Sequence, residues 1–274
     1  MKGAKRMVRK YQSGDVIEIS SFIVGNATKT RKPRRTGATP PRKQEQNERA
    51  AERYLARLIN CNFFHGLSSF VTLKYSVNRF ERLINGVIRS GQPLTHETIR
   101  EAAVKERDNF LRRVQYELKK YGAELKYIAL TSDRDGDTGE NVRIHHHILI
   151  PKIALEIAIK HWGIDEIDIR ALSDQKDHTP IAVYLLRQVT REKSMHKYKA
   201  SRNLAHPIIT EEIVYVNKEI KPPQGAVVKQ RTYDSESGTQ YIRYIEPPPR
   251  KTRRRATALE YERDSVDGHA NDNT

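Results

Sequence analysis

Residues 143–150 read Arg143-Ile144-His145-His146-His147-Ile148-Leu149-Ile150, and this run carries the most information on how the chain folds. Apolar, partly β-branched residues surround three consecutive histidines, which is the composition of a buried strand. Because side chains alternate along a strand, we expect His145 and His147 on one face, about 7 Å apart. His146 is expected on the other face, in apolar packing. A His-x-His pair on a strand is often accidental, but two imidazoles on one rigid face can also hold a divalent metal.

The neighbouring segments predict how this strand is paired. Residues 125–130 read as a second strand, and an Asp/Gly-rich turn over 132–140 joins it to the histidine strand, which favours an antiparallel pair. After the histidines, the spacing predicts a helix near 154–162 that ends at Gly163. Residues 166–170 then alternate as another strand.

Three longer helices are predicted around these strands. Residues 44–60 carry apolar residues at three- and four-residue spacings, and a long helix opens after the cap candidate Thr95 and ends at Gly122. Thr179-Pro180 is a typical helix start, and residues 70–75 alternate as a short strand. The order predicts an α+β fold in which a central antiparallel sheet has helices mainly on one face, leaving the other for a ligand and metal.

Changes in composition divide the chain into four parts, at 1–43, 44–207, 208–246 and 247–274. The first is a basic arm, loosely held over residues 1–12, with one possible strand over 15–24. Residues 29–43 are rich in Lys, Arg and Pro and serve either as a solubilising tether or as a phosphate-binding arm. The part from 44 to 207 is the main domain, 208–246 is a β-rich extension, and the last part is a disordered tail.

Charge is the strongest global clue to the partner. The chain has 274 residues and a formal net charge of +16, which creates a positive field that attracts polyanions, usually nucleic acid. A single cysteine, Cys61, excludes an internal disulfide. No stretch approaches the roughly 18 apolar residues of a membrane span, and no phosphate-binding P-loop is present. A cytoplasmic protein without a membrane partner and without its own ATPase is expected.

A metal on two histidines needs further oxygen ligands if it is Mg²⁺ or Mn²⁺. Acidic residues on the 132–140 turn are candidates, and Asp133 is nearest the end of the neighbouring strand. Tyr184 is the candidate nucleophile, although a phenol with a pKa near 10 needs cations to stabilise its phenolate. Arg187 and Gln188 share its helix face. The alternative for Tyr184 is an aromatic of the helix core.

These residues resemble a known family. Its motifs are a strand reading roughly Phe-apolar-Thr-Leu-Thr-aromatic, a His-hydrophobic-His metal strand and a helix with Tyr-x-x-Lys. The matching segments are Phe70-Val71-Thr72-Leu73-Lys74-Tyr75, the run from Arg143 to Leu149, and Ala182-Val183-Tyr184-Leu185-Leu186-Arg187. The chain is similar over residues 44–207 to the rolling-circle replication initiators of the HUH endonuclease superfamily, which occur on bacterial plasmids, phages and integrative elements.

The resemblance implies a ferredoxin- or RRM-like HUH fold and a metal-dependent endonuclease that nicks and rejoins single-stranded origin DNA. On this view His145, His147 and Asp133 hold Mg²⁺ or Mn²⁺, Tyr184 forms a 5′-phosphotyrosine link, and Arg187 neutralises charge. Expected DNA contacts are Thr72, Lys74, Arg191, Lys197, Lys199 and Arg202. With Gln188 in place of a second tyrosine, a dimer partner or water completes a round. A host helicase and polymerase are the further partners.

The sequence departs from the family pattern at four positions. His146 stands where an apolar residue is usual, Lys74 replaces a threonine, Arg187 replaces a lysine, and Ser132 lies where many relatives have a glutamate ligand. Three alternatives therefore stay open. They are a non-enzymatic nucleic-acid-binding protein, a relaxase or transposase of the same superfamily, and a plain metallohydrolase that ignores the tyrosine.

Overall fold

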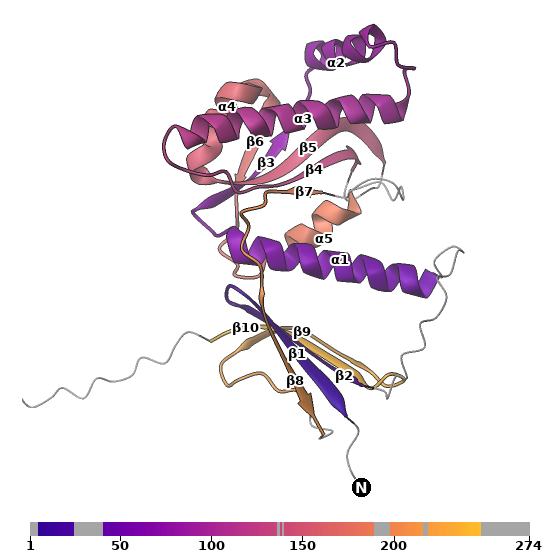
Figure 1. The fold of residues 1–274 in the computed structure, drawn as a ribbon, viewed down its shortest axis with the longest axis vertical. Helices are drawn as coiled ribbons and strands as arrows, with labels where there is room; N and C mark the ends of the chain where they lie inside the picture. The colour runs from indigo at the N-terminus through magenta and orange to yellow at the C-terminus, as the bar shows by residue number, and fades with distance from the viewer. Residues whose placement is uncertain are drawn as a thin grey trace, which may run out of the picture.

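The computed structural model describes residues 5–24, 41–135, 138, 140–188, 198–215 and 219–247. Within these ranges the protein is α+β, with two five-stranded antiparallel sheets and five α-helices (Figure 1). Among the described residues, no helix combines the length and apolar character needed to cross a membrane.

The first sheet contains the histidine strand and is called the histidine sheet. Its strands, in spatial order, are β6 (Ile167–Ala171), β3 (Ser68–Leu73), β5 (Asn141–Pro151), β4 (Ile128–Arg134) and β7 (Lys199–Ala200). The predicted antiparallel pair of β4 and β5 is confirmed, with Ser132 opposite His145 and Leu130 opposite His147. Strand β5 is central because both of its faces are apolar, so it can be covered on both sides.

Helices cover both faces of the histidine sheet, so the prediction of helices mainly on one face is wrong. On one face lie α3 (His96–Lys119) and α4 (Leu155–Trp162), and α2 (Val77–Arg89) packs on α3. On the other lie α1 (Pro41–Asn62) and α5 (Thr179–Arg187). The cause is visible in β5, where Ile148 packs into the α3 cluster while its neighbour Leu149 packs into the α1–α5 cluster.

The second sheet joins the two ends of the described chain and is called the terminal sheet. Its order is β8 (Ile208–Val214), β1 (Arg6–Ser13), β2 (Val16–Ile23), β10 (Thr239–Ile245) and β9 (Val227–Asp234). The expected strand over 15–24 is confirmed. Residues 6–12, expected to be loosely held, instead form β1 between β2 and β8. Arg6 is buried there, with its guanidinium donating to the Ser21 hydroxyl and carbonyl.

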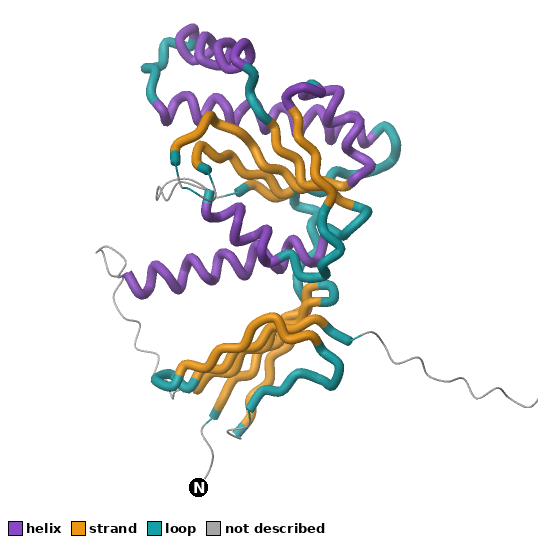
Figure 2. Tube along the Cα trace, turned by 180° about the vertical axis from the view of Figure 1, so that it is seen from behind, coloured by secondary structure: helices purple, strands orange, loops and turns teal. Residues whose placement is uncertain are grey.

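Helix α1 lies between the two sheets in both views of the backbone (Figure 1, Figure 2). Its contact with the terminal sheet is made by cations rather than by an apolar stripe. Arg57 donates two hydrogen bonds to the Glu18 carboxylate, at 2.9 and 2.8 Å, and stacks 3.4 Å from the centre of the Tyr11 ring. Arg53 stacks on Tyr241 at 4.1 Å. Paired charges therefore fix the orientation of the terminal sheet on the rest of the molecule.

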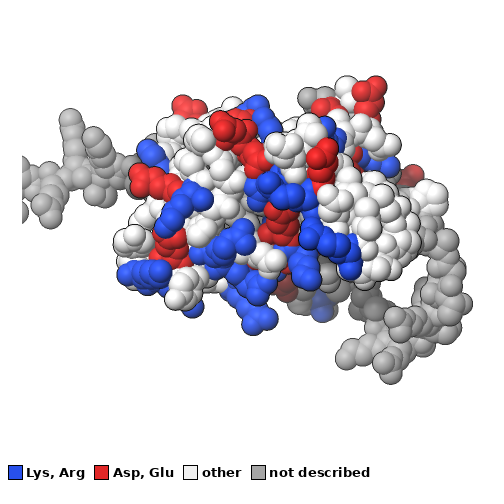
Figure 3. Space-filling view, turned by 90° about the horizontal axis from the view of Figure 1, so that it is seen from above, with Lys and Arg blue, Asp and Glu red and all other residues white. Residues whose placement is uncertain are grey.

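The outer side of α2 and α3 is densely charged. Figure 3 looks down on this side and shows Lys and Arg side chains gathered across the middle of the face, with Asp and Glu between them. Part of the basic excess of the sequence therefore lies on the side of the histidine sheet that faces away from α5. Residues 25–40, which carry five Lys or Arg and no acidic residue, and residues 248–274 lie outside the described residues. They include most of the expected arm over 29–43 and most of the expected disordered tail, whereas residues 41–43 of that arm instead begin α1.

Candidate metal and nucleophile site

His145 and His147 project from the same face of β5, as predicted, with 3.0 Å between their Nε2 atoms. The His145 Nδ1 lies 3.0 Å from the Arg143 carbonyl oxygen, which can only accept, so this nitrogen carries the proton. In the neutral ring, the lone pair of His145 is therefore on Nε2 and faces His147. A backbone hydrogen bond of this kind fixes both the tautomer and the direction of the ring.

His147 is buried and held from two sides. Its Nδ1 lies 3.1 Å from the Thr72 hydroxyl on β3, and its Nε2 lies 2.6 Å from the side-chain oxygen of Gln188. Burial, together with the neighbouring His145 imidazole, lowers the pKa of His147 to about 4. At neutral pH the ring is therefore uncharged, which is the form that binds a metal.

The three atoms that meet here suit a hard divalent cation. His145 Nε2 and the Gln188 amide oxygen are acceptors, and His147 Nε2 lies between them at 3.0 and 2.6 Å. Two octahedral ligands at right angles, each about 2.1 Å from a cation, lie about 3.0 Å apart, which matches the imidazole pair. The amide nitrogen of Gln188 is buried without a hydrogen-bond partner. No group of three His, Cys, Asp or Glu side chains converges within the described residues, so the third ligand available is an amide.

Tyr184 lies beside this cluster on α5. Its ring centre is 5.9 Å from that of His147 and 6.3 Å from that of Phe70. The side chain is 40% exposed, whereas Ala182 and Leu185 of the same helix are buried. Tyr184 is therefore at the edge of the helix's apolar stripe rather than in the core. One helical turn further on, Gln188 brings its side chain to His147, so a single short helix supplies both the phenol and the amide.

A pocket of about 890 Å³ opens over these residues. Its lining includes His145, His147 and Tyr184, an apolar part that contains Phe70, Leu172 and Ile181, and the cations Lys74, Arg143 and Arg170. Asp168 on β6 is the acidic member, 3.9 Å from Lys74 and 3.5 Å from Arg170. The pocket thus combines the imidazole pair, an exposed phenol, a surface for ring stacking and three cations, and Gln188 contacts the pair from the buried side of His147.

His146 points to the opposite face, as predicted, and is fully buried. Its two nitrogens lie 3.0 Å from the Tyr75 hydroxyl and 2.9 Å from the Thr131 hydroxyl. Burial drives the pKa of His146 well below its usual value, so it is neutral. The apolar environment is reinforced by Trp162, whose ring packs edge-on against the imidazole. His146 is therefore a structural residue in the core behind the site.

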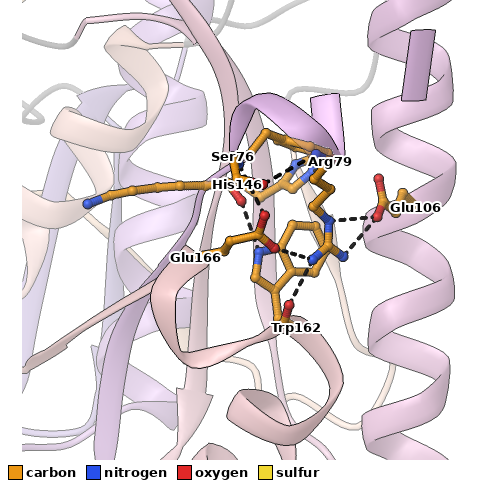
Figure 4. Close-up of polar contacts among 8 residues, drawn as sticks. Ser76, Arg79, Glu106, His146, Trp162 and Glu166 are labelled. Atoms are coloured by element: carbon orange, nitrogen blue, oxygen red, sulfur yellow. Dashed lines mark hydrogen bonds and ion pairs between the residues drawn. The ribbon is translucent and has the colours of Figure 1, made fainter. Parts of the chain in front are cut away.

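A charged network holds this core from behind (Figure 4). Arg79 of α2 stacks 3.6 Å from the centre of the Trp162 ring and donates to the Trp162 carbonyl. It also donates to the carboxylates of Glu106 on α3 and Glu166 before β6, at 2.9 and 2.6 Å. The indole N–H of Trp162 donates to the Lys74 carbonyl at the end of β3. The network thereby joins three helices to the strand ends beside the pocket.

Asp133 is not brought to the histidines. It follows Ser132, which faces the site, and so it projects to the α3 side of the sheet. There its carboxylate lies 3.0 Å from the Arg100 guanidinium and 2.9 Å from the His96 imidazole. The buried cation on α3 accounts for this placement. Gln188, and not Asp133, is the third side chain that lies beside the histidine pair.

The predicted cations and DNA contacts separate into several groups. Thr72 and Lys74 line the pocket, although Thr72 also orients His147. Arg187 is exposed at the end of α5 and does not line the pocket. Lys199 pairs with Asp108 at the far edge of the histidine sheet, and Arg202 is exposed nearby. Arg191 and Lys197 lie outside the described residues.

Two positions that were noted in the sequence, but not predicted as site residues, contact the histidine pair or support it. Gln188 follows Tyr184 by four residues, which is the spacing that places both side chains on one helix face. Ser132 is fully buried and its hydroxyl donates a hydrogen bond to the Gln188 carbonyl at 2.8 Å. The serine therefore anchors the end of α5 that bears the amide ligand.

Comparison with models of known protein families, with curated proteins and with solved structures gave no match.

Proposed function

We propose that this protein is a metal-dependent endonuclease and ligase-type transesterase that acts on unpaired DNA through Tyr184, in the manner of rolling-circle replication initiators. The observation that carries the proposal is the placement of an exposed phenol beside two imidazoles and an amide oxygen that converge on one point. A structural tyrosine does not require such a ligand set, and a simple hydrolytic site does not require the phenol.

Each site residue has a separate role in the proposed reaction. His145, His147 and Gln188 would hold Mg²⁺ or Mn²⁺, and such a cation polarises a phosphodiester and offsets charge on its oxygens. The Tyr184 oxygen attacks phosphorus after losing its proton, a P–O tyrosine bond forms, and the bond from phosphorus to the 3′ oxygen breaks. The departing 3′ oxygen takes up a proton and becomes a free hydroxyl. The link is a phosphodiester on both sides of the reaction, so the reverse attack rejoins DNA without ATP.

The cations on the pocket are better placed than Arg187 to meet the DNA backbone. Lys74, Arg143 and Arg170 all line the pocket, whereas Arg187 does not. We therefore assign phosphate binding to these three residues and propose that Phe70 stacks against an unpaired base. Asp168 holds Lys74 and Arg170 near one another and limits the local excess of positive charge.

A role in rolling-circle replication implies further partners. The 3′-hydroxyl left by the reaction can prime a host polymerase, and a separate helicase would unwind the duplex because the sequence has no P-loop. Tyr75 also lines the pocket but is buried against His146, so Tyr184 is the one exposed phenol among the described residues of the lining, and a second subunit or water would complete a round. A relaxase or transposase would share the same pocket chemistry and differ in its DNA substrate.

The proposal is tested with a pool of 3′-labelled single-stranded oligonucleotides whose core is randomised, incubated with the protein and Mn²⁺. We expect the label to move into a covalent protein–DNA band in the wild type. The band is lost in Tyr184→Phe and retained in Tyr116→Phe, a matched control because Tyr116 is 69% exposed on α3. Cut ends without an adduct would indicate a hydrolase. Tight binding without cleavage would indicate a binding protein. Either result overturns the proposal.

A further inference from the structure

The start of helix α5 is held by a buried aspartate. The Asp177 carboxylate accepts hydrogen bonds from the Thr179 backbone N–H at 2.9 Å and from the Thr179 hydroxyl at 2.5 Å. Thr179 is the first residue of α5. The helix has only nine residues, and His178 before it makes no side-chain capping bond. Asp177 is thus the side chain that fixes the first turn, about two turns before Tyr184.

The second oxygen of Asp177 is held by the terminal sheet. Arg243 of β10 lies 3.1 Å from it, and the two side chains are 15% and 5% exposed. Arg243 is 66 residues beyond Asp177 in the sequence and belongs to the other sheet. A buried ion pair of this kind has few alternative positions, because moving either partner leaves the other charge without compensation.

A second connection between the terminal sheet and the start of α5 passes through α1. Gly14, in the turn between β1 and β2, adopts φ +60°, and a Cβ added there would lie 2.8 Å from the Asn60 carbonyl oxygen. The Asn60 side-chain oxygen accepts the His178 backbone N–H at 2.8 Å. The terminal sheet therefore reaches the start of α5 both directly, through Arg243, and through the end of α1.

We infer that the terminal sheet is a positioning element for α5, and that Arg243 acts through Asp177 to align Tyr184 and Gln188 with the histidine pair. This inference rests on the proposed function. The nucleophile lies on a helix of nine residues and the amide ligand is the C-cap residue of that helix, so a small rotation at the first turn would move both groups. Displacements of about 1 Å at a reacting group can lower a rate by about 100-fold. Arg243 is a positioning residue and does not itself line the pocket.

The experiment compares Arg243→Ala and Arg243→Lys with the matched control Lys176→Ala. Lys176 also joins this loop to the terminal sheet, through Asp15 at 2.9 Å, but that pair is more than half exposed. We expect Arg243→Ala to lower the single-turnover rate of adduct formation on the labelled oligonucleotide pool by at least about tenfold. The oligonucleotide concentration that half-saturates the variant should stay within about twofold of the wild-type value, because the phosphate-binding cations do not lie on α5. Arg243→Lys restores part of the rate, and Lys176→Ala behaves as the wild type.

Binding of Mn²⁺ alone, followed by electron paramagnetic resonance, gives a readout that does not need nicking. Arg243→Ala is expected to weaken Mn²⁺ binding because Gln188 shifts with the helix. If the wild type forms no adduct while Arg243→Ala still weakens Mn²⁺ binding, the proposed function fails and the positioning role stands. A wild-type rate and Mn²⁺ affinity in Arg243→Ala would overturn the inference. The inference would also be overturned if the lower rate, the weaker DNA binding and the weaker Mn²⁺ binding of Arg243→Ala were all accounted for by the fraction of the variant that is unfolded.

Discussion

Three adjacent histidines on β5 occupy three different environments. His145 is partly exposed and bonded to a backbone carbonyl, His147 is buried against Gln188, and His146 is enclosed by the core behind the sheet. Strand alternation predicts which two share a face. It does not predict which other residue completes the cluster, because Gln188 reaches His147 from 41 residues away through the packing of α5. Asp133 was predicted as this residue because of its position near the adjacent turn, but its carboxylate lies on the other face of the sheet, paired with Arg100.

The buried histidines make stability depend on pH. Burial lowers the pKa of His146 well below that of an unfolded histidine and lowers that of His147 to about 4. The unfolded chain therefore binds more protons than the native protein below about pH 6.5, so stability is lost as the pH falls through this range. Between pH 6.5 and 5 we expect each histidine to lower the free energy of unfolding by up to about 1.4 kcal/mol for each unit that the pH falls. Urea unfolding with a chelator present measures this decrease. His146→Gln should remove one contribution, and an unchanged slope in that variant would contradict the assignment.

Gln188 can be tested as a ligand separately from catalysis. Gln188→Ala removes the oxygen that lies 2.6 Å from His147 Nε2, so Mn²⁺ affinity should fall by about tenfold or more. Gln188→Glu keeps an oxygen there and adds negative charge, so it should bind Mn²⁺ at least as tightly as the wild type. Gln92→Ala, at an exposed glutamine, is the control. Equal affinity in Gln188→Ala and Gln92→Ala, measured by calorimetric titration, would remove Gln188 from the site.

At the scale of elements, local signals predicted most of the histidine sheet. The helices α1, α3, α4 and α5 and the strands β3, β5 and β6 all fall close to the expected ranges, whereas β4 begins at Ile128 and extends to Arg134, three to four residues later than expected. Helix α2 was not predicted, although its sequence is clearly amphipathic, with Phe80, Leu83 and Val87 on its packed side and Ser76 capping its first turn. Strand β1 was missed because its cations read as a solvated arm, although one of them, Arg6, is buried.

The network around Arg79 should be one of the most sensitive points in the fold. Arg79→Ala leaves the carboxylates of Glu106 and Glu166 without their shared cation and removes the stacking on Trp162. We expect a loss of about 3 kcal/mol in the free energy of unfolding. Arg82→Ala on the same helix is the control and should change stability by less than about 0.5 kcal/mol. Chemical denaturation checks both values, and similar losses in the two variants would show that the network is not specific.

The turn between β1 and β2 depends on the absence of a side chain. Gly14→Ala introduces strain from φ +60° and a contact of 2.8 Å with the Asn60 carbonyl, so we expect it to destabilise by more than about 1 kcal/mol. Gly91→Ala has a similar φ of +73° but open space around its Cβ, so it isolates the cost of the backbone conformation. Thermal unfolding of the two variants should show a larger decrease for Gly14→Ala. Equal decreases would mean that the turn does not press on α1.

At the scale of the whole molecule, the terminal sheet is the part that the sequence did not reveal. Strands β1 and β2 come from residues 6–23, and β8, β9 and β10 come from residues 208–245. Pairing between strands so far apart in the sequence leaves no local pattern. Short alternating segments were visible at both ends of the chain, but nothing in them indicates that β2 pairs with β10 or β1 with β8. The position of α1 between the sheets depends on arginine–aromatic stacking and on the Arg57–Glu18 pair, which are properties of the assembled structure.

The proposed reaction requires Tyr184 and the histidine–glutamine cluster to act on the same phosphodiester. Peptide mapping by tandem mass spectrometry, after reaction of the wild type with the oligonucleotide pool and Mn²⁺, measures this most directly. We expect a nucleotide joined through its 5′ phosphate to the peptide that contains Tyr184, formed with Mn²⁺ and absent when a chelator replaces it. A nucleotide on any other tyrosine, or an adduct that forms equally well in the chelator, would contradict the account.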